Sequence, residues 1–349
     1  ADVPEPSGPT MDLTATNIVI ATGAKPHPLP GNPFAGALID STQALEVNEF
    51  PSSAVIIGAG AIALEFASMW NAAGSKVTLL IRKDRVLSVW DRRAGTTLTR
   101  ELKRHGVNII TRASVTHVDT GANLGATVHY TREGQDGEQS VWGEIALVAI
   151  GRDPITDPAW GVTIDDHGHV ATDAYGRTDK PGVWAVGDVT AGHALAHRAF
   201  EQGIVIAETI AGLNPKPVDE AAVPQIVFSF PEAASVGLTV EQAQAREDLV
   251  EIKETNYPML ANARMLMSGT AGSLTIVSGC DAANPDTPRV LGVHMVSPMA
   301  SDIIAEAEQL VGNHVPLADA ARLVHPHPTF SETLGEALLK ADGRPLHTR

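Results

Sequence analysis

Apolar and polar positions first define a strand–helix–strand unit over residues 54–81. Its first strand, Ala54–Ile57, has no polar position, which is typical of a parallel strand buried on both faces of a sheet. A glycine-containing turn leads into a helix that stops at Gly74, and a second strand follows at Val77–Ile81. The helix is expected to bury one side, which carries Ile62, Phe66, Met69 and Ala73. The pattern predicts a βαβ unit of an α/β fold.

Shorter apolar runs on either side of this unit predict further strands and helices. The other expected strands lie at Asn17–Ala21, Val107–Ile110, Ala113–Val118, Ala126–Thr131, Ile145–Ile150, Gly182–Val186, Gln225–Phe230, Leu274–Val277 and Val290–Val296. The other expected helices lie at Arg93–His105, Leu195–Ala211, Ser301–Val311 and Ser331–Ala341. A linker at Asn214–Pro217 precedes the last part of the chain, which is predicted to be a separate α+β domain.

Composition and charge narrow the function classes. The 349 residues allow two or three domains, and 44% hydrophobic with 19% charged residues is typical of a soluble globular protein. The net charge of −16 argues against nucleic acid or an anionic membrane as a partner, and no apolar run approaches the roughly 18 residues that span a bilayer. The single cysteine, Cys280, excludes an internal disulfide framework and favours a cytoplasmic location. The start, ADVPEPSGPT, has neither an initial methionine nor a secretion signal, which suggests a fragment or a processed product.

The turn after the first strand of the βαβ unit carries Gly58-x-Gly60-x-x-Ala63. In such a fingerprint the first glycine permits the tight turn, the second lets a pyrophosphate approach the backbone, and the small third residue lets helix and strand pack closely. The free amides at the start of the helix would receive the phosphates. A glycine turn without function is the alternative, but the complete βαβ context favours dinucleotide binding.

The end of the second strand distinguishes the two nicotinamide cofactors. NAD sites place an acidic residue there for the ribose 2′-hydroxyl, whereas NADP sites place arginine against the 2′-phosphate. This strand ends in Arg82 and Lys83, and Arg82 lies 24 positions after Gly58. Asp84 follows beyond the strand end. The alternative is that both basic side chains are simply solvated; the pattern favours NADP, with NAD also possible.

Two further strand ends suggest a second nucleotide. Thr22-Gly23 and Gly187-Asp188 each follow a short apolar strand, and Asp188 is suited to accept hydrogen bonds from a polyol chain. The helix that opens at Leu195-Ala196-His197 would aim its amides at a polar ring edge. Gly151-Arg152, after another strand, is a further cofactor-binding candidate. Each of these could be an ordinary turn, but their order around the βαβ unit favours a cofactor site.

The run from His325 to Glu332, HPHPTFSE, brings a histidine and a carboxylate to short spacing. A glutamate bonded to one ring nitrogen fixes the tautomer and leaves the other nitrogen for proton transfer. The alternative is a capping box, Thr329-x-x-Glu332, in which the glutamate bonds a backbone N–H at a helix start. The two roles have equal weight, and one carboxylate is not expected to hold both full-time.

No metal-binding or catalytic role is predicted for the other histidines considered or for the cysteine. The pairs His193/His197 and His167/His169 lack a cysteine or carboxylate cluster, so no metal site is predicted. Cys280 has no evident activating base and is not expected to be a nucleophile.

In chain order, the motifs ATGAKP, VIIGAGAIALEFA, AIGRDP, WAVGDVT and HPHPTFSE resemble those of the flavoprotein pyridine nucleotide-disulfide oxidoreductases. This family includes dihydrolipoyl dehydrogenase and the glutathione, mycothione and mercuric reductases, and the resemblance covers nearly the whole chain. It implies a Rossmann-like NAD(P)-binding domain at residues 31–144, inserted in a partial FAD-binding domain at residues 1–30 and 145–215. A dimerisation domain at residues 219–349 would follow.

The resemblance also implies roles for individual residues. The NAD(P) site would contain Gly58, Gly60, Ala63, Glu65 near the nicotinamide, and Arg82 and Lys83 on the 2′-phosphate. The FAD site would contain Thr22, Gly23, Gly151, Arg152, Gly187, Asp188 on the ribityl chain, and Leu195, Ala196 and His197 near the flavin pyrimidine edge. His327, where the family's His-Pro-Thr motif begins, and Glu332 would reach the active site of the other subunit of a homodimer.

The resemblance thus implies an enzyme in which hydride passes from NADPH, or NADH, to FAD and on to a disulfide or related acceptor. The HPHPTFSE run favours dihydrolipoyl dehydrogenase, whereas the basic strand end favours the NADPH-dependent reductases. The family's first FAD-binding GxGxxG and its redox-active CxxxxC pair have no counterpart in this sequence. The alternative is therefore a truncated, catalytically incomplete module that binds a nucleotide and dimerises.

Overall fold

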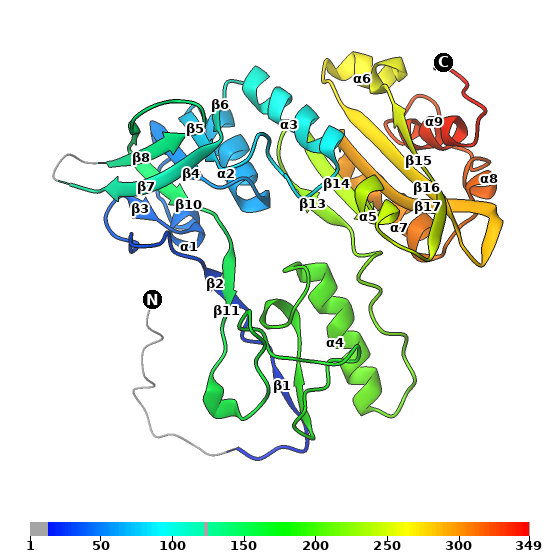
Figure 1. Cartoon of the computed structure of the whole chain (residues 1–349), viewed down its shortest axis with the longest axis horizontal. Coiled ribbons are helices and arrows are strands. Elements are labelled where there is room, and N and C mark those ends of the chain that lie inside the picture. The colour runs from blue at the N-terminus through cyan, green and yellow to red at the C-terminus, as the bar shows by residue number, and fades with distance from the viewer. Residues whose placement is uncertain (1–12, 122–124, 349) are drawn as a thin grey trace. The chain divides into compact units, whose positions relative to one another are not determined.

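The computed structural model describes residues 13–121 and 125–348, and these divide into two compact units (Figure 1). One unit joins the described residues up to Lys25 to Asp153–Val218, and the other joins the described residues of Pro26–Arg152 to those from Asp219 onward. A long segment is thus inserted in the sequence between the two parts of the first unit.

The inserted segment contains a parallel sheet of five strands in the order β3-β10-β4-β5-β6. The strands are β3 (Leu38–Ile39), β4 (Ser53–Ile57), β5 (Lys76–Ile81), β6 (Asn108–Thr111) and β10 (Ile145–Val148). The helices are α1 (Ser41–Leu45), α2 (Ala61–Ala72) and α3 (Arg92–Arg104). The predicted βαβ unit is therefore confirmed as β4, α2 and β5.

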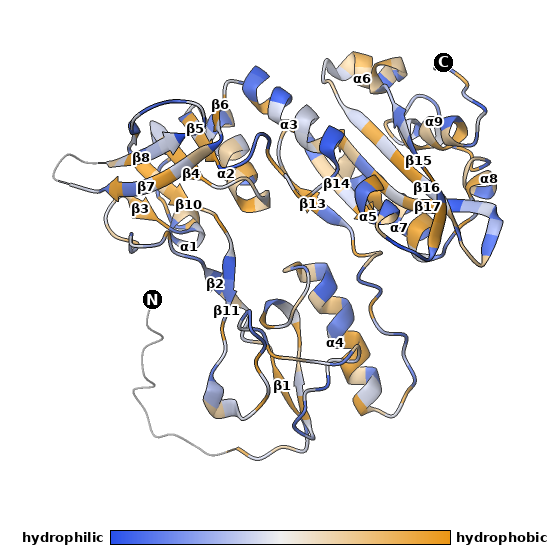
Figure 2. Ribbon diagram, viewed as in Figure 1, coloured by the Kyte–Doolittle hydropathy of each residue, from blue (hydrophilic) through white to orange (hydrophobic). Residues whose placement is uncertain are grey.

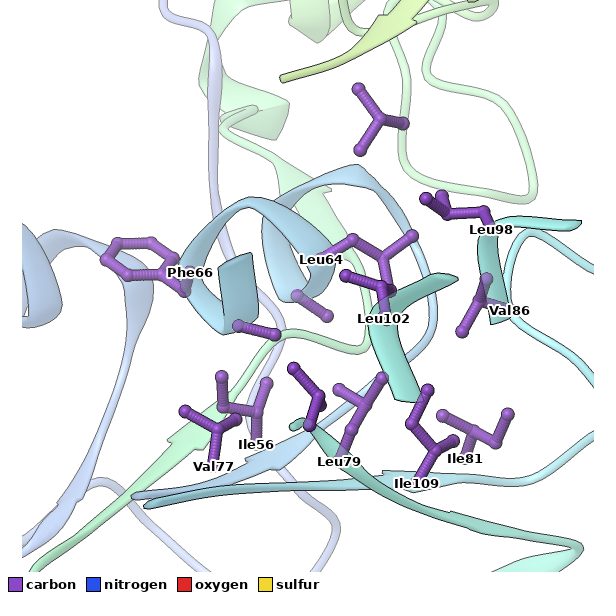
Figure 3. Close-up of a cluster of buried hydrophobic side chains, with 14 of the residues drawn as sticks. Ile56, Leu64, Phe66, Val77, Leu79, Ile81, Val86, Leu98, Leu102 and Ile109 are labelled. Atoms are coloured by element: carbon purple, nitrogen blue, oxygen red, sulfur yellow. The ribbon is translucent and has the colours of Figure 1, made fainter. Parts of the chain in front are cut away.

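Alternate residues of this sheet supply two cores. Ile56 and Leu79 contribute to a core with Leu64 of α2 (Figure 3). Val55 and Leu80 belong to a second core, shared with a three-stranded antiparallel sheet. That sheet has the order β7-β8-β9, with β7 (Ala113–Asp119), β8 (Ala126–Arg132) and β9 (Gln139–Gly143). Burial on both faces explains the continuously apolar first strand.

The predicted buried side of α2 is wrong at Met69 and Ala73. Met69 is 42% exposed, and Ala73 is exposed and follows the end of the helix. The buried residues of α2 are Ala63, Leu64, Phe66, Ala67 and Trp70. Almost every position of this helix is apolar or small, so the sequence pattern did not determine which face is buried. Packing against the sheet determines it.

The carboxy-terminal part forms a second five-stranded sheet, antiparallel, in the order β13-β14-β17-β16-β15. The strands are β13 (Gln225–Val227), β14 (Glu232–Gly237), β15 (Leu249–Tyr257), β16 (Ser273–Asp281) and β17 (Asn284–Ser297). The helices are α5 (Val240–Gln244), α6 (Ala263–Ser268), α7 (Ala300–Gly312), α8 (Leu317–Ala320) and α9 (Glu332–Ala341), with a 3₁₀ turn at Met259–Ala261.

β16 and β17 are rich in hydrophobic residues, whereas α3 is largely hydrophilic (Figure 2). Residues of this sheet and of α7 and α9 share one apolar core, which gives the expected α+β domain.

The other unit pairs β1 (Ile18–Ile20) with β12 (Val183–Ala185) in parallel. Its long helix is α4 (Ala196–Ile210), and 3₁₀ turns lie at Pro158–Trp160 and Gly187–Val189. Where the chain passes between the units, β2 (Ala24–Pro26) pairs with β11 (Arg152–Pro154). The mixed α/β class predicted from the sequence is confirmed.

Candidate functional site

The two glycines of the turn between β4 and α2 differ in how closely other atoms approach them. Gly58 has a φ of +142°, and a Cβ there would lie 2.1 Å from the carbonyl oxygen of Ala149. Only glycine fits this position, because the obstacle is backbone. Gly60 has a φ of −90°, and no atom lies within 4 Å of the place where its Cβ would be. The packing of the described residues therefore requires the first glycine but gives no reason for the second.

The start of α2 has no side-chain cap. Gly60 is the N-cap and provides no side-chain cap, so the first amides of the helix have no partner of that kind. Ala63 is fully buried, in the core beneath the turn. Uncapped amides and the helix dipole are the features that a helix start uses to bind an anion.

Glu65, the residue expected near the nicotinamide, lies half-buried on α2. Its Oε1 accepts a hydrogen bond of 3.0 Å from the amide of Phe228. One turn along the helix, Ser68 Oγ accepts a bond of 2.9 Å from the amide of Phe230. These two bonds tie α2 to the segment after β13.

Arg82 and Lys83 directly follow β5, and both side chains are exposed. The nearest acidic residue in sequence, Asp84, pairs with Arg85 at 3.3 Å. Within the described parts of the chain, no ion pair involves either Arg82 or Lys83. Two cationic side chains thus stand at the strand end where the sequence predicted them.

The structure brings Thr22-Gly23 and Gly187-Asp188 to the same edge, because β1 and β12 are parallel neighbours and the amide of Val186 donates to Ile20 O at 3.0 Å. The backbone is left-handed at Gly23 and Gly187, with φ of +72° and +77°. The hydroxyl of Thr22 donates to Ile155 O at 2.7 Å, so it also closes the local turn.

At α4, Leu195 is the N-cap and provides no side-chain cap, while Ala196 and His197 form an exposed first turn. Gly151 has a φ of +150° and its carbonyl accepts from the amide of His27 at 3.0 Å; Arg152 opens β11.

His327 and Glu332 are bonded to one another, with 2.8 Å between His327 Nδ1 and Glu332 Oε1. The other oxygen, Oε2, accepts from the amide of Thr329 at 2.8 Å. The carboxylate therefore makes both of the expected bonds, one with each oxygen. The capping box is incomplete, because Ser331 and not Thr329 is the N-cap of α9 and no side-chain cap bond is present. Burial opposes ionisation of Glu332, but the bonds from Thr329 and His327 hold the pKa of its carboxyl below the ordinary value.

The first histidine of the run, His325, received no role from the sequence. Its side chain is 9% exposed, and its Nε2 lies 2.9 Å from Glu306 Oε1 on α7. A Cβ on Gly335 would lie 2.3 Å from His325 Nδ1, so the ring packs on the backbone of α9. The hydrogen bond to Glu306 raises the pKa of His325 against the effect of burial. A glycine in the middle of a helix was the signal for such a close contact.

Comparison with known proteins identifies the family. The model of the pyridine nucleotide-disulphide oxidoreductases matches residues 2–203, and the model of the dimerisation domain of these enzymes matches residues 223–338. The chain belongs to the pyridine nucleotide-disulphide oxidoreductase family. The inserted Rossmann-like domain, the dimerisation domain and the oxidoreductase class predicted from the sequence are those of this FAD-containing family.

Relatives within the family include two dihydrolipoyl dehydrogenases. That of Cupriavidus necator is 37% identical over 341 residues, which cover 96% of this chain and 70% of the relative. That of Bacillus subtilis is 36% identical, with the same coverage of 96% and 70%.

Among solved structures, LpdA from Mycobacterium tuberculosis has a TM-score of 0.82 and 27% identity, covering 93% of this chain and 69% of LpdA. The Cu(II) complex of the HOCl-induced flavoprotein disulfide reductase RclA from Escherichia coli has a TM-score of 0.81 and 27% identity, covering 93% and 72%. No helix within the described ranges has the length and apolar character needed to cross a bilayer.

Proposed function

We propose that this family member is an NADPH-preferring, FAD-dependent oxidoreductase that serves a dithiol–disulfide couple and acts as a homodimer. When bound, the nicotinamide supplies a hydride and the flavin accepts it. The residues of this chain bind and orient the two cofactors and hold a proton for the acceptor.

The observation that carries the proposal is the contrast between the two glycines of the β4–α2 turn. Gly58 is required by the backbone of Ala149, whereas the space beside Gly60 is open. A pyrophosphate that approaches the backbone needs this open space, next to the uncapped amides of α2. Gly58, Gly60 and Ala63 would therefore form the phosphate cradle, with Glu65 beyond it on the same helix.

Arg82 and Lys83 would hold the 2′-phosphate that distinguishes NADPH from NADH. Both are exposed cations at the end of β5, and neither forms an ion pair within the described residues. Arginine forms paired bonds with phosphate oxygens, and lysine adds a point charge.

The flavin would bind at the common edge of β1 and β12. Left-handed glycines at positions 23 and 187 allow close approach of a ligand, and the uncapped start of α4 offers amides to the flavin pyrimidine edge. The proposed set is Thr22, Gly23, Gly151, Arg152, Gly187, Asp188, Leu195, Ala196 and His197.

His327 would be the catalytic base, and Glu332 its positioning residue. The bond from Nδ1 to Glu332 fixes the ring and leaves Nε2 to take a proton from a thiol or return it to a thiolate. The ring is 72% exposed, which suits a group that serves a second subunit. The matching dimerisation domain and the named dihydrolipoyl dehydrogenase relatives support the homodimer and an acceptor of the lipoyl class.

Calorimetric titration of the purified chain with NADPH and NADH tests the cofactor assignment. The double variant Arg82→Gln/Lys83→Gln is expected to lose about 10- to 100-fold in affinity for NADPH, because charge-assisted bonds are lost, and to keep its affinity for NADH. Arg92→Gln/Arg93→Gln is the matched control, since it removes the same charge from the exposed start of α3.

Two results would refute the assignment. Equal losses for NADPH and NADH would remove the 2′-phosphate role, and a folded wild-type chain that takes up neither nucleotide would remove the cradle. Flavin absorbance of the purified chain tests the FAD set separately: a colourless sample that still binds NADPH would overturn that set and leave the cradle intact.

A further inference from the structure

The three-stranded sheet β7-β8-β9 carries a pair of histidines on its outer face. Residues Ala126, Val128 and Tyr130 of β8 point into the core, so His129 points away from it. On β7 the register shifts between Val115 and His117, and this bulge sets His117 directly opposite His129. In a regular ladder Thr116 would occupy that place; a bulge re-aims the side chain that follows it.

The two rings are stacked, with centroids 4.1 Å apart and planes at 9° to one another. Two carboxylates lie at opposite edges of the stacked rings, Asp119 beside the Nε2 atoms and Glu138 beside the Nδ1 atoms. Asp119 Oδ2 lies 3.1 Å from His129 Nε2 and 3.9 Å from His117 Nε2. Glu138 presents one oxygen to each ring, 3.7 Å from His117 Nδ1 and 3.6 Å from His129 Nδ1.

We propose that His117, His129 and Asp119 bind a divalent transition-metal ion of the zinc type. One ligand atom from each of the three residues lies within 4.8 Å of the others. Zinc bonds to imidazole nitrogen and carboxylate oxygen are about 2.0–2.2 Å long and lie in the plane of the ring, so the two stacked rings would tilt toward each other to bind one ion. All three side chains are exposed or half-exposed, which leaves room for this movement. Three protein ligands leave a fourth position for water.

Glu138 supports the assignment from the far side of the rings. A metal-bound histidine usually donates its other N–H to a carboxylate, which fixes the tautomer and raises the basicity of the ligating nitrogen. Glu138 lies 3.7 and 3.6 Å from the two Nδ1 atoms, longer than a hydrogen bond, so its carboxylate would have to move closer to accept from them. It is held by the hydroxyl of Thr116, which donates to Oε1 at 2.7 Å and also lies 3.3 Å from His117 Nδ1. The bulge residue thus fixes the carboxylate that would orient both ligands.

The nitrogen and oxygen donors of the cluster favour some metal ions over others. Two imidazoles with one carboxylate suit zinc, copper, nickel or cobalt, whereas magnesium and calcium prefer oxygen donors. The net charge of −16 favours cations in general but does not distinguish these metals. Because the ligands come from two strands, the ion would join β7 to β8 and stabilise the folded chain in proportion to its occupancy.

Calorimetry with Zn²⁺ on the chelator-treated chain, prepared without a polyhistidine tag, tests the site. We expect one equivalent to bind, the unfolding temperature to rise on addition of zinc, and an excess of Mg²⁺ to leave both results unchanged. His117→Ala and His129→Ala should each weaken this binding at least about 100-fold, and Glu138→Gln by about 10- to 100-fold. His167→Ala is the matched control, since it removes an exposed histidine outside the cluster and should change nothing.

Several outcomes would overturn the proposal. These are no zinc uptake by the wild-type chain, unchanged uptake in His129→Ala, or loss of uptake in His167→Ala. Circular dichroism of each variant without metal shows whether it is folded, and Asp119→Asn provides a further ligand deletion if either alanine variant is not. The site is independent of the cofactor assignments, so nucleotide titrations are expected to be the same with and without zinc.

Discussion

The turn at Gly58 and the loop that carries His327 are both proposed to serve the reaction, but they are built in different ways. The turn is made of backbone and is closely packed at its first glycine, since a Cβ on Gly58 would lie 2.1 Å from the carbonyl oxygen of Ala149. The loop presents a side chain that is 72% exposed and is held by one carboxylate, that of Glu332. Steric packing determines the first region, and hydrogen bonds to a charged group determine the second.

This difference determines what each region tolerates. Added atoms should damage the turn, while a change of pH should leave it intact. The loop has room for added volume, but it depends on the charge and on both oxygens of Glu332. The following substitutions and titrations test that contrast, from the largest expected effect to the smallest.

Replacing Gly58 by alanine should have the largest effect. The new methyl group would overlap the backbone of Ala149, and the residue would be strained at a φ of +142°, so the free energy of unfolding should fall by about 3 kcal/mol or more. Gly60→Ala is the matched control. Its Cβ meets no protein atom, so the loss of stability should stay below about 1 kcal/mol.

The same pair separates folding from binding. Gly60→Ala should weaken NADPH binding about 10- to 100-fold while the protein remains folded, because the methyl group occupies the approach of the pyrophosphate. Thermal unfolding and calorimetry measure the two effects. A Gly58→Ala protein as stable as wild type would show that the turn is not sterically closed.

Replacing Glu332 by glutamine should have the next largest effect. Glutamine has one acceptor oxygen, but two donors, the Thr329 amide and His327 Nδ1–H, now use the carboxylate. Either one bond is lost, which should cost about 1–3 kcal/mol of stability, or the glutamine amide donates to His327 Nδ1 and the ring takes the tautomer that carries its proton on Nε2. Turnover of a lipoyl disulfide by the native enzyme should fall about 100-fold, since the base loses its orientation.

Glu306→Gln is the control for this substitution, because the glutamine oxygen can still accept from the single partner, His325. Comparable losses in the two variants would argue that the second oxygen of Glu332 contributes nothing.

Acid should destabilise the loop in a defined direction. The pKa of Glu332 is lowered in the folded state, so its contribution is present above the unfolded value of about 4.3 and is lost as the pH falls through the lower folded value. Denaturant unfolding between pH 3 and pH 6 should show a steeper loss in wild type than in Glu332→Gln. Parallel curves would contradict the shift.

The smallest effect should come from His325 and should have the opposite sign. Its hydrogen bond to Glu306 raises the folded pKa, so the contribution is complete below the unfolded value of about 6.5 and is lost as the pH rises through the folded value. The difference in unfolding free energy between wild type and Glu306→Gln should therefore shrink from pH 6 to pH 9. A stability difference between the two proteins that grows from pH 6 to pH 9 would contradict a raised pKa of His325.

The βαβ unit could be predicted from the sequence because its signals are local. A buried strand, a glycine turn and a helix follow one another, and Gly58 needs its left-handed backbone at the place the fingerprint requires. The buried face of α2 could not be predicted in full, because its composition allowed several faces and Met69 proved exposed.

Contacts between distant segments were missed. His325 meets Glu306 across 19 positions, and its ring fits only because residue 335 is glycine. A bulge brings His117 opposite His129, and the alternation of apolar and polar residues along the strand does not predict where a bulge lies. Both bonds of Glu332 were expected as alternatives, and that they form together through separate oxygens depends on geometry that the sequence does not contain.

The hydrogen bonds from Phe228 and Phe230 to α2 have one more consequence. A helix held at two positions, one turn apart, by the segment after β13 cannot tilt toward an arriving ligand without straining both bonds. The amides at its tip are therefore preorganised, and the entropy of ordering them is lost during folding rather than on association. At the proposed nucleotide site, selection among ligands would then depend more on shape complementarity than on movement of this helix.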